Sequence, residues 1–141
     1  MNNVPQPAGR AARTLQQRRA ADAWAKTTAV RDDKGLSVEQ KREYGQLIRG
    51  LSAMIRHDGL GPSLAFLRAK NKPHHQRAYQ HLSDWVLGEH ARIRSQNDHR
   101  DSLLEWSFQD ATSERYRWAT TEALTYLVWL KRFVEALELT E

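Results

Sequence analysis

The segment LRAKNKPHHQRAYQH, residues 67–81, gathers the side chains of this chain that could do chemistry. It contains four basic residues and three histidines but no carboxylate. Histidine serves as a metal ligand and as an acid–base group, whereas lysine and arginine bind anions. The segment therefore raises three possibilities: a metal site, a catalytic centre, or a surface that holds something anionic. Its charged and ionisable residues are Arg68, Lys70, Lys72, Arg77, His74, His75 and His81.

The spacing of the histidines argues against a metal site. In a helix, His74 and His81 share a face but lie two turns, about 10.5 Å, apart, whereas the ligands of one zinc ion all come within about 2.1 Å of it. His81 and Asp84 lie one turn apart, yet no third ligand accompanies them. The chain has no cysteine, which excludes thiolate ligands and a cysteine nucleophile. We therefore expect no metal and no cofactor, and we interpret the histidines as polar surface groups.

A catalytic alternative comes from Arg94 and His99, which form the pattern R-x4-H. This is the spacing that helical ribonucleases of the HEPN type use at the scissile phosphate of RNA. Ser95, however, stands where that family usually carries Asn, Asp or His. The pattern also lies in a polar stretch, residues 88–101, that has no helical period. A ribonuclease is thus one alternative, and no other catalytic motif is present.

The basic residues are distributed unevenly. Residues 1–94 carry 17 Lys or Arg against 8 acids, and residues 95–141 carry 5 against 9. Arg42, Arg49 and Arg56 recur every seven residues, so on a helix they form one ridge. A solvated charge stripe is one explanation, but acid-poor basic segments also fit a surface that contacts RNA phosphates without reading sequence. On charge alone we predict RNA contacts at Lys26, Arg42, Arg49, Arg68, Lys72 and Arg77.

The apolar residues predict an all-α fold, because every strong pattern repeats at three or four residues and none alternates with period two. The chain has 141 residues, the size of one domain. We expect a flexible N-terminal tail at residues 1–9 and, at residues 10–141, a single-domain bundle of about six helices around a long apolar C-terminal helix. The expected helices cover residues 13–30, 37–58, 62–70, 73–87, 103–108 and 112–139.

The chain shows no membrane or export signal. Its least polar run, Trp118 to Leu130, has 13 residues and includes Glu122, whereas a span across a bilayer needs about 20 apolar residues. The N-terminus has no charged segment followed by an apolar one. We therefore expect a cytoplasmic protein without a membrane partner.

Four segments between Arg13 and Leu137 carry a family resemblance. They read TLQQRRAADAWA, REYGQL, DGLGPSLAFLRAK and WATTEALTYLVWLKRFVEAL. In this order and approximate spacing they resemble the small helical subunit of the type III-B CRISPR effector, the Cmr RNA-silencing complex. Residues 72–100 have no match.

The resemblance implies a non-catalytic subunit that stacks head to tail with its own copies. It would lie beside the backbone and large subunits of the Cmr complex and line the groove that receives the target RNA. From the family's motifs we carry over RNA contacts at Arg18, Arg19 and Lys70. Lys131 and Arg132 also match, and their acidic surroundings favour subunit contacts. A third interpretation is a bundle that binds only protein, with its basic faces meeting acidic partners.

Overall fold

The structure is a computed structural model that describes residues 13–141, so the predicted tail at residues 1–9 lies outside the described residues. This part of the chain forms helices joined by turns and contains no strand. The prediction of an all-α bundle is confirmed. The helices are α2 (Leu15–Asp32), α3 (Val38–Asp58), α4 (Leu60–Lys70), α5 (Pro73–Val86), α6 (Leu103–Gln109) and α7 (Ser113–Ala136).

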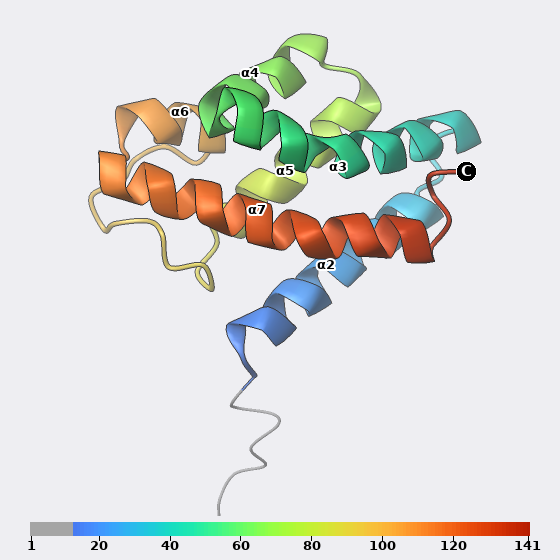
Figure 1. Ribbon diagram of the computed structural model, residues 1–141, viewed down its shortest axis with the longest axis horizontal. Coiled ribbons are helices and arrows are strands. Elements are labelled where there is room, and N and C mark those ends of the chain that lie inside the picture. The colour runs from blue at the N-terminus through green and yellow to red at the C-terminus, as the bar shows by residue number, and fades with distance from the viewer. Residues whose placement is uncertain (1–12) are drawn as a thin grey trace, which may run out of the picture.

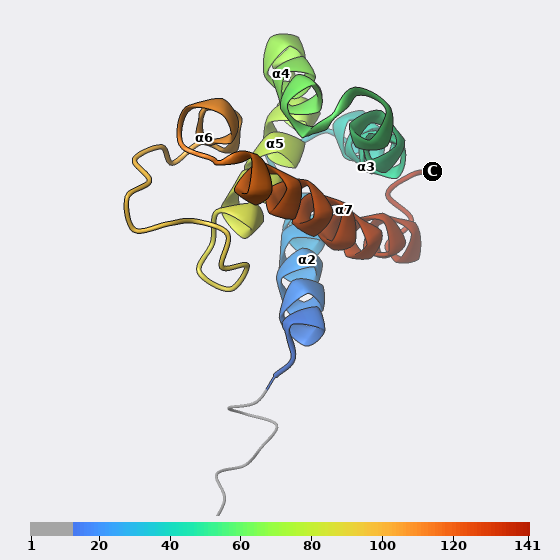
Figure 2. The same cartoon turned by 60° about the vertical axis from the view of Figure 1, so that its left-hand side comes forward.

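Helix α7 crosses the middle of the molecule and is the element around which the others pack. It contacts α2, α3 and α5, while α4 packs on α3 and α5, and α6 packs on α4 and α5. Figures 1 and 2 show α2 on one side of α7 and α3, α4 and α6 on the other. The predicted central position of the C-terminal helix is confirmed, but α7 is not covered all round. Trp118 is 47% exposed and Val128 is 52% exposed.

Short-range signals set most of the helix ends. The Ser37 hydroxyl accepts a hydrogen bond from the Gln40 amide at 3.1 Å, and the Gln40 side chain accepts one from the Ser37 amide at 2.8 Å. The two bonds together form a capping box at the start of α3. Gly59 has φ of 97°, which ends α3, and Pro73 is the first residue of α5. Helix α4 begins at Leu60 rather than at Pro62, because proline is tolerated within the first helical turn, where its missing N–H has no helical partner.

Helix α2 differs from the rest in how little apolar surface it buries. Its fully buried residues are Ala23, Thr27 and Val30, all of them small or β-branched. Helix α3, in contrast, buries Tyr44 and four other residues along one face. The attachment of α2 to the bundle therefore depends on polar contacts as well as on apolar ones.

The C-terminal residues fold back onto α3 at Gly45. A Cβ atom built on Gly45 would lie 2.8 Å from the Leu139 carbonyl oxygen and 2.9 Å from the Leu139 carbonyl carbon. Glycine is thus required here for the close approach of two backbones. Gly50 lies in the same helix, and a Cβ atom there would have no neighbour within 4 Å.

These two glycines give a matched test of the fold. We expect Gly50→Ala to raise the free energy of unfolding by about 1 kcal/mol, because alanine favours a helix more than glycine does. Gly45→Ala should lower it by about 1–3 kcal/mol, because the new methyl group overlaps the Leu139 backbone. Urea denaturation of both variants measures the difference. Equal stabilisation by both substitutions would contradict the described packing of the C-terminal residues on α3.

Candidate nucleic-acid interface

Arg19 lies in a buried ion pair that joins three helices. Its Nη2 atom donates to Glu122 Oε1 of α7 at 2.8 Å, and the Trp85 indole of α5 donates to Glu122 Oε2 at 2.8 Å. The side chains of Arg19 and Glu122 are only 16% and 8% exposed. Burial by itself raises the pKa of Glu122, but the hydrogen bonds from Arg19 and Trp85 outweigh it and lower that pKa. Arg19 thus holds helices together rather than pointing into solvent.

Lys26 is also used within the fold. Its ammonium lies 2.7 Å from Asp22 Oδ2 and donates to the His81 carbonyl at 3.2 Å. It also lies 5.3 Å from the centre of the Tyr126 ring, and Asp22 accepts a hydrogen bond from the Tyr126 hydroxyl. These contacts connect α2 to α5 and α7.

Two of the three arginines on the α3 ridge have carboxylate partners. Arg42 pairs with Glu39, which lies one turn earlier on the same helix. Arg49 Nε lies 3.4 Å from Glu135 Oε2, which α7 brings alongside. Periodicity along α3 could not show either partner, because one lies beside the ridge and the other on another helix.

Arg68 and Arg77 are paired as well, although no acid is near them in sequence. Arg68 donates to both oxygens of Glu105 of α6 at 2.8 Å. Hydrogen bonds from Arg68 and then Ser102 lower the pKa of Glu105 to about 2. Arg77 donates to Asp33, in the turn between α2 and α3, at 2.8 Å. The fold thus supplies the carboxylates that the segment itself lacks.

Three of the nine predicted RNA contacts, Arg18, Lys70 and Lys72, have no carboxylate partner among residues 13–141. Lys70 and Lys72 flank Asn71, whose φ of 54° ends α4 and turns the chain into α5. Arg18 lines a cleft together with Trp85, near the other end of α5. Because α5 has 14 residues, its two ends lie about 21 Å apart. The unpaired members of the predicted set therefore lie in two separate places rather than along one track.

The two residues predicted to contact other subunits lie near the C-terminal end of α7. Arg132 Nη1 lies 3.2 Å from Glu135 Oε1, the carboxylate that Arg49 also approaches. Lys131 has no carboxylate partner within the described part of the chain. Their role in subunit contact stays a prediction.

The histidines of the opening segment are not surface groups, so that interpretation is wrong. His74 and His75 are 7% and 8% exposed, and their rings lie 4.1 Å apart. Pro73 starts α5 directly before them, which turns His74 toward Glu43 of α3 and His75 toward Phe66 of α4. Burial lowers the pKa of both. Within residues 13–141, no three His, Asp or Glu side chains come together as metal ligands would.

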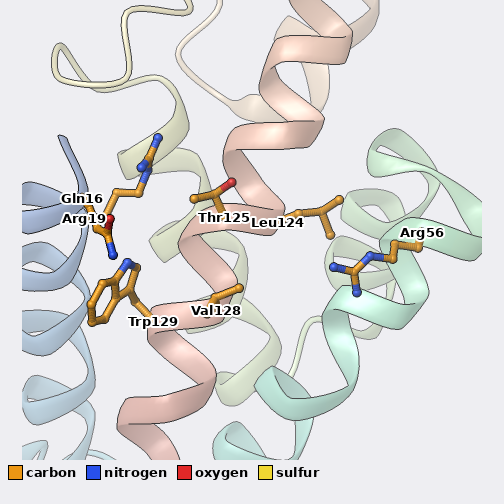
Figure 3. A pocket seen from close by; sticks show the side chains of 7 residues that line it. All are labelled: Gln16, Arg19, Arg56, Leu124, Thr125, Val128 and Trp129. Carbon is orange, nitrogen blue, oxygen red and sulfur yellow. The ribbon is translucent and has the colours of Figure 1, made fainter.

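A shallow groove runs along the exposed side of α7. Figure 3 shows Gln16 and Arg19 of α2 on one side of it and Arg56 of α3 on the other. Its floor is formed by Leu124, Thr125, Val128 and Trp129 of α7, and its volume is about 350 Å³. The groove combines an apolar floor with a basic edge, a composition suited to contact with protein.

Arg94 and His99 lie in the non-helical segment between α5 and α6. The Arg94 guanidinium donates to the Arg100 carbonyl at 2.8 Å and to Asp101 Oδ1 at 3.3 Å. The backbone amide of His99 donates to Asp110 Oδ2 at 2.8 Å. The Arg94 side chain is therefore engaged in holding its own loop.

Comparison with known proteins connects this helical bundle to one family. The model of the CRISPR-associated protein family Cas_Cmr5 matches residues 15–137. The chain belongs to this family. A crystal structure of a CRISPR-associated Cmr5 family protein from Thermus thermophilus matches it with a TM-score of 0.67 and 27% sequence identity, over 89% of this chain and 97% of that one. The predicted resemblance to a small Cmr subunit is confirmed.

Membership of the Cmr5 family supports a role as a subunit of the Cmr complex of a type III-B CRISPR system. As for membranes, none of the helices described here has the length and apolar character that crossing a bilayer requires.

Sequence reasoning did not select Arg92 and His90, which line the same cleft as Arg18. Both belong to the polar stretch at residues 88–101, where the absence of any period gave no way to place a side chain. The stretch carries three arginines against three acids, so its charge gave no signal either.

The role of Arg19 can be tested against its neighbour. Arg19→Ala should lower the free energy of unfolding by about 2–4 kcal/mol, because Glu122 is left buried without its counter-charge. Arg18→Ala removes the same charge from an unpaired position and should change it by less than about 0.5 kcal/mol. Chemical denaturation compares the two. Equal effects would contradict a structural role for Arg19.

The burial of His81 predicts acid sensitivity. Burial, followed by the nearby Lys26 charge, lowers the pKa of His81 to about 3, and the Tyr44 hydroxyl lies 2.7 Å from His81 Nδ1. In the unfolded chain this histidine takes up a proton near pH 6.5, so between about pH 6.5 and 3 the unfolded state binds more protons. The free energy of unfolding should therefore decrease as the pH is lowered through this window, by up to about 1.4 kcal/mol per pH unit from His81.

His81→Asn is the informative variant, because asparagine offers an acceptor to Tyr44 but does not titrate. Denaturation at several pH values between about 6.5 and 5 should show a shallower slope for this variant than for the wild type. His74 and His75 act in the same direction and keep the remaining slope above zero. Identical slopes would show that folded His81 takes up its proton as the unfolded residue does.

Proposed function

We propose that this chain is a non-catalytic subunit of the type III-B CRISPR ribonucleoprotein that helps to hold guide and target RNA by their phosphates. The observation that carries the proposal is that the Lys70 side chain, which lies in the family-like segment DGLGPSLAFLRAK, is exposed and has no carboxylate partner within the described residues. It is therefore free to meet a phosphate.

The turn around Lys70 favours an anion. Lys72 is the N-cap of α5, and no side chain caps the first amides of this helix. The positive end of a helix dipole favours negative charge, and two lysines two residues apart add to it. Only Asn71 separates the two lysines, so both flank the same turn.

The paired arginines support the proposal much less. A phosphate that approaches Arg42, Arg49 or Arg68 must compete with a carboxylate that already neutralises the charge. When the phosphate displaces that carboxylate, a negative group is left without its partner. Counterion release, which drives phosphate binding, is therefore weaker at these positions than at Lys70 and Lys72.

We further propose that copies of the chain stack head to tail beside the backbone and large subunits of the complex. A contact between two different surfaces of one chain propagates into an open row. The half-exposed side of α7, with Val128 and the groove beside it, offers an apolar surface for such a contact. Lys131 and Arg132 lie one turn beyond this groove on the same helix.

We propose no enzymatic role for the R-x4-H pattern. A nuclease of that type needs its arginine to be available to the scissile phosphate. Here the Arg94 guanidinium is occupied by Asp101 and the Arg100 carbonyl.

The lysines of the α4–α5 turn give the direct test. In the assembled complex, Lys70→Ala combined with Lys72→Ala should weaken binding of target RNA. The slope of log K against log salt should become shallower by about 0.7–0.9 for each phosphate that the variant no longer neutralises. Titration of labelled RNA at several salt concentrations measures both quantities.

Arg42→Ala combined with Arg49→Ala is the matched control, since it removes the same two charges from paired positions. Its slope should change much less. If both double variants assemble and bind RNA like the wild type, the α4–α5 turn does not hold RNA, and the result favours the protein-only interpretation. Cleavage of RNA by the isolated chain that disappears in His99→Ala would instead establish the ribonuclease.

A further inference from the structure

A cleft separates the start of α2 from the segment that follows α5. It consists of two adjoining hollows of about 520 and 270 Å³, which share Arg18 and His90. The larger hollow is also lined by Leu15, Glu89 and Arg92. Together the hollows reach the size of pockets that hold small organic ligands.

A column of aromatic rings leads from the core into this cleft. The rings of Tyr126 and Trp85 are nearly parallel, with an angle of 7° and 5.2 Å between their centres. The ring of His90 continues the column, at 6.2 Å and 30° from that of Trp85. Trp85 is only 4% exposed, whereas the His90 side chain is 43% exposed. The column therefore ends at the surface with a flat ring, a shape that favours stacking.

Three arginines surround the exposed end of this column. Arg13 lines the smaller hollow, Arg92 lines the larger one, and Arg18 lines both. Within residues 13–141, none of the three has a carboxylate partner. Arg92 also has a φ of 57°, a left-handed conformation that a non-glycine residue seldom adopts.

Two carboxylates line the cleft and limit what it can bind. Asp22 is already engaged by the Lys26 ammonium and the Tyr126 hydroxyl. Glu89 is 88% exposed, and its Oε1 atom lies 3.9 Å from His90 Nε2. Of the two, Glu89 is therefore the carboxylate that would oppose an anion.

We infer that this cleft binds a single nucleotide of an RNA strand. The base stacks on the exposed ring of His90, and the flanking phosphates lie against Arg18 and Arg92. A bare phosphate would use the arginines but not the ring, and an acidic peptide would likewise leave the aromatic column without a role. The inference rests on the proposed function for its source of RNA, and it adds a second contact about 21 Å from the Lys70–Lys72 turn.

The test uses the full chain and a short single-stranded RNA, with the indole N–H signals of the five tryptophans as reporters. The Trp85 indole donates a hydrogen bond to Glu122, and Trp85 lines the cleft. The Trp106 indole donates a hydrogen bond to Asp98, and Trp106 does not line the cleft. Titration followed by NMR should shift the Trp85 signal and leave that of Trp106 in place. RNA binding with an unmoved Trp85 signal would overturn the inference and leave the proposed function standing.

Variants of the cleft separate stacking from charge. His90→Ala should weaken RNA binding about fivefold or more, the lower range for stacking of one base, and His90→Phe should restore it. An abasic oligonucleotide of equal charge should bind the wild type and His90→Ala alike. Glu89→Gln should tighten binding by about 1.5- to 5-fold, a gain that a folding defect would not produce.

Two further results decide the ligand. Adenosine monophosphate that binds as tightly as the RNA would assign the cleft to free nucleotides and overturn the inference. In the assembled complex, loss of RNA affinity in Lys70→Ala with Lys72→Ala but not in His90→Ala would also overturn it while supporting the proposed function. Loss in both variants would support both.

Discussion

The position of α2 depends on the buried ion pair between Arg19 and Glu122. This helix buries few large apolar side chains, so the hydrophobic effect alone specifies its position on α7 weakly. The ion pair adds a directional contact, and the Trp85 indole satisfies the second oxygen of Glu122. Such a pair is expensive to desolvate and contributes little net stability, but it penalises any other register, since a shifted helix would leave a charge buried alone.

The same contact determines what the surface of α2 can do. The Trp85 indole donates a hydrogen bond to Glu122, and Trp85 lines the cleft. Arg18 also lines the cleft, whereas Arg19, the next residue in the chain, points into the bundle. Of two adjacent arginines, one is therefore structural and the other faces the cleft. Tyr126 and Lys26 extend this arrangement at Asp22, which lines the smaller hollow: Tyr126 donates a hydrogen bond to its carboxylate, and Lys26 neutralises the charge.

The sequence predicts the helices well because their limits depend on neighbours in the chain. Ser37 with Gln40, the left-handed Gly59 and the leading Pro73 each act within one turn. Whether a charged side chain is paired depends on partners distant in the sequence, since Arg19 and Glu122 are 103 residues apart and Arg68 and Glu105 are 37 residues apart. A count of local acids could not find them. Burial of His74 and His75 likewise follows from how α5 packs on α3 and α4. The spacing of the histidines in the sequence does not predict this packing.

Internal pairing has a consequence for how such a subunit could hold RNA. Most of the predicted RNA contacts are compensated, and only Arg18, Lys70 and Lys72 of that set are unpaired within the described residues, at opposite ends of α5. A few phosphate contacts give weak binding at physiological salt. If copies stack in a row as we propose, each added subunit meets the same strand at high effective concentration, and weak contacts combine into strong retention.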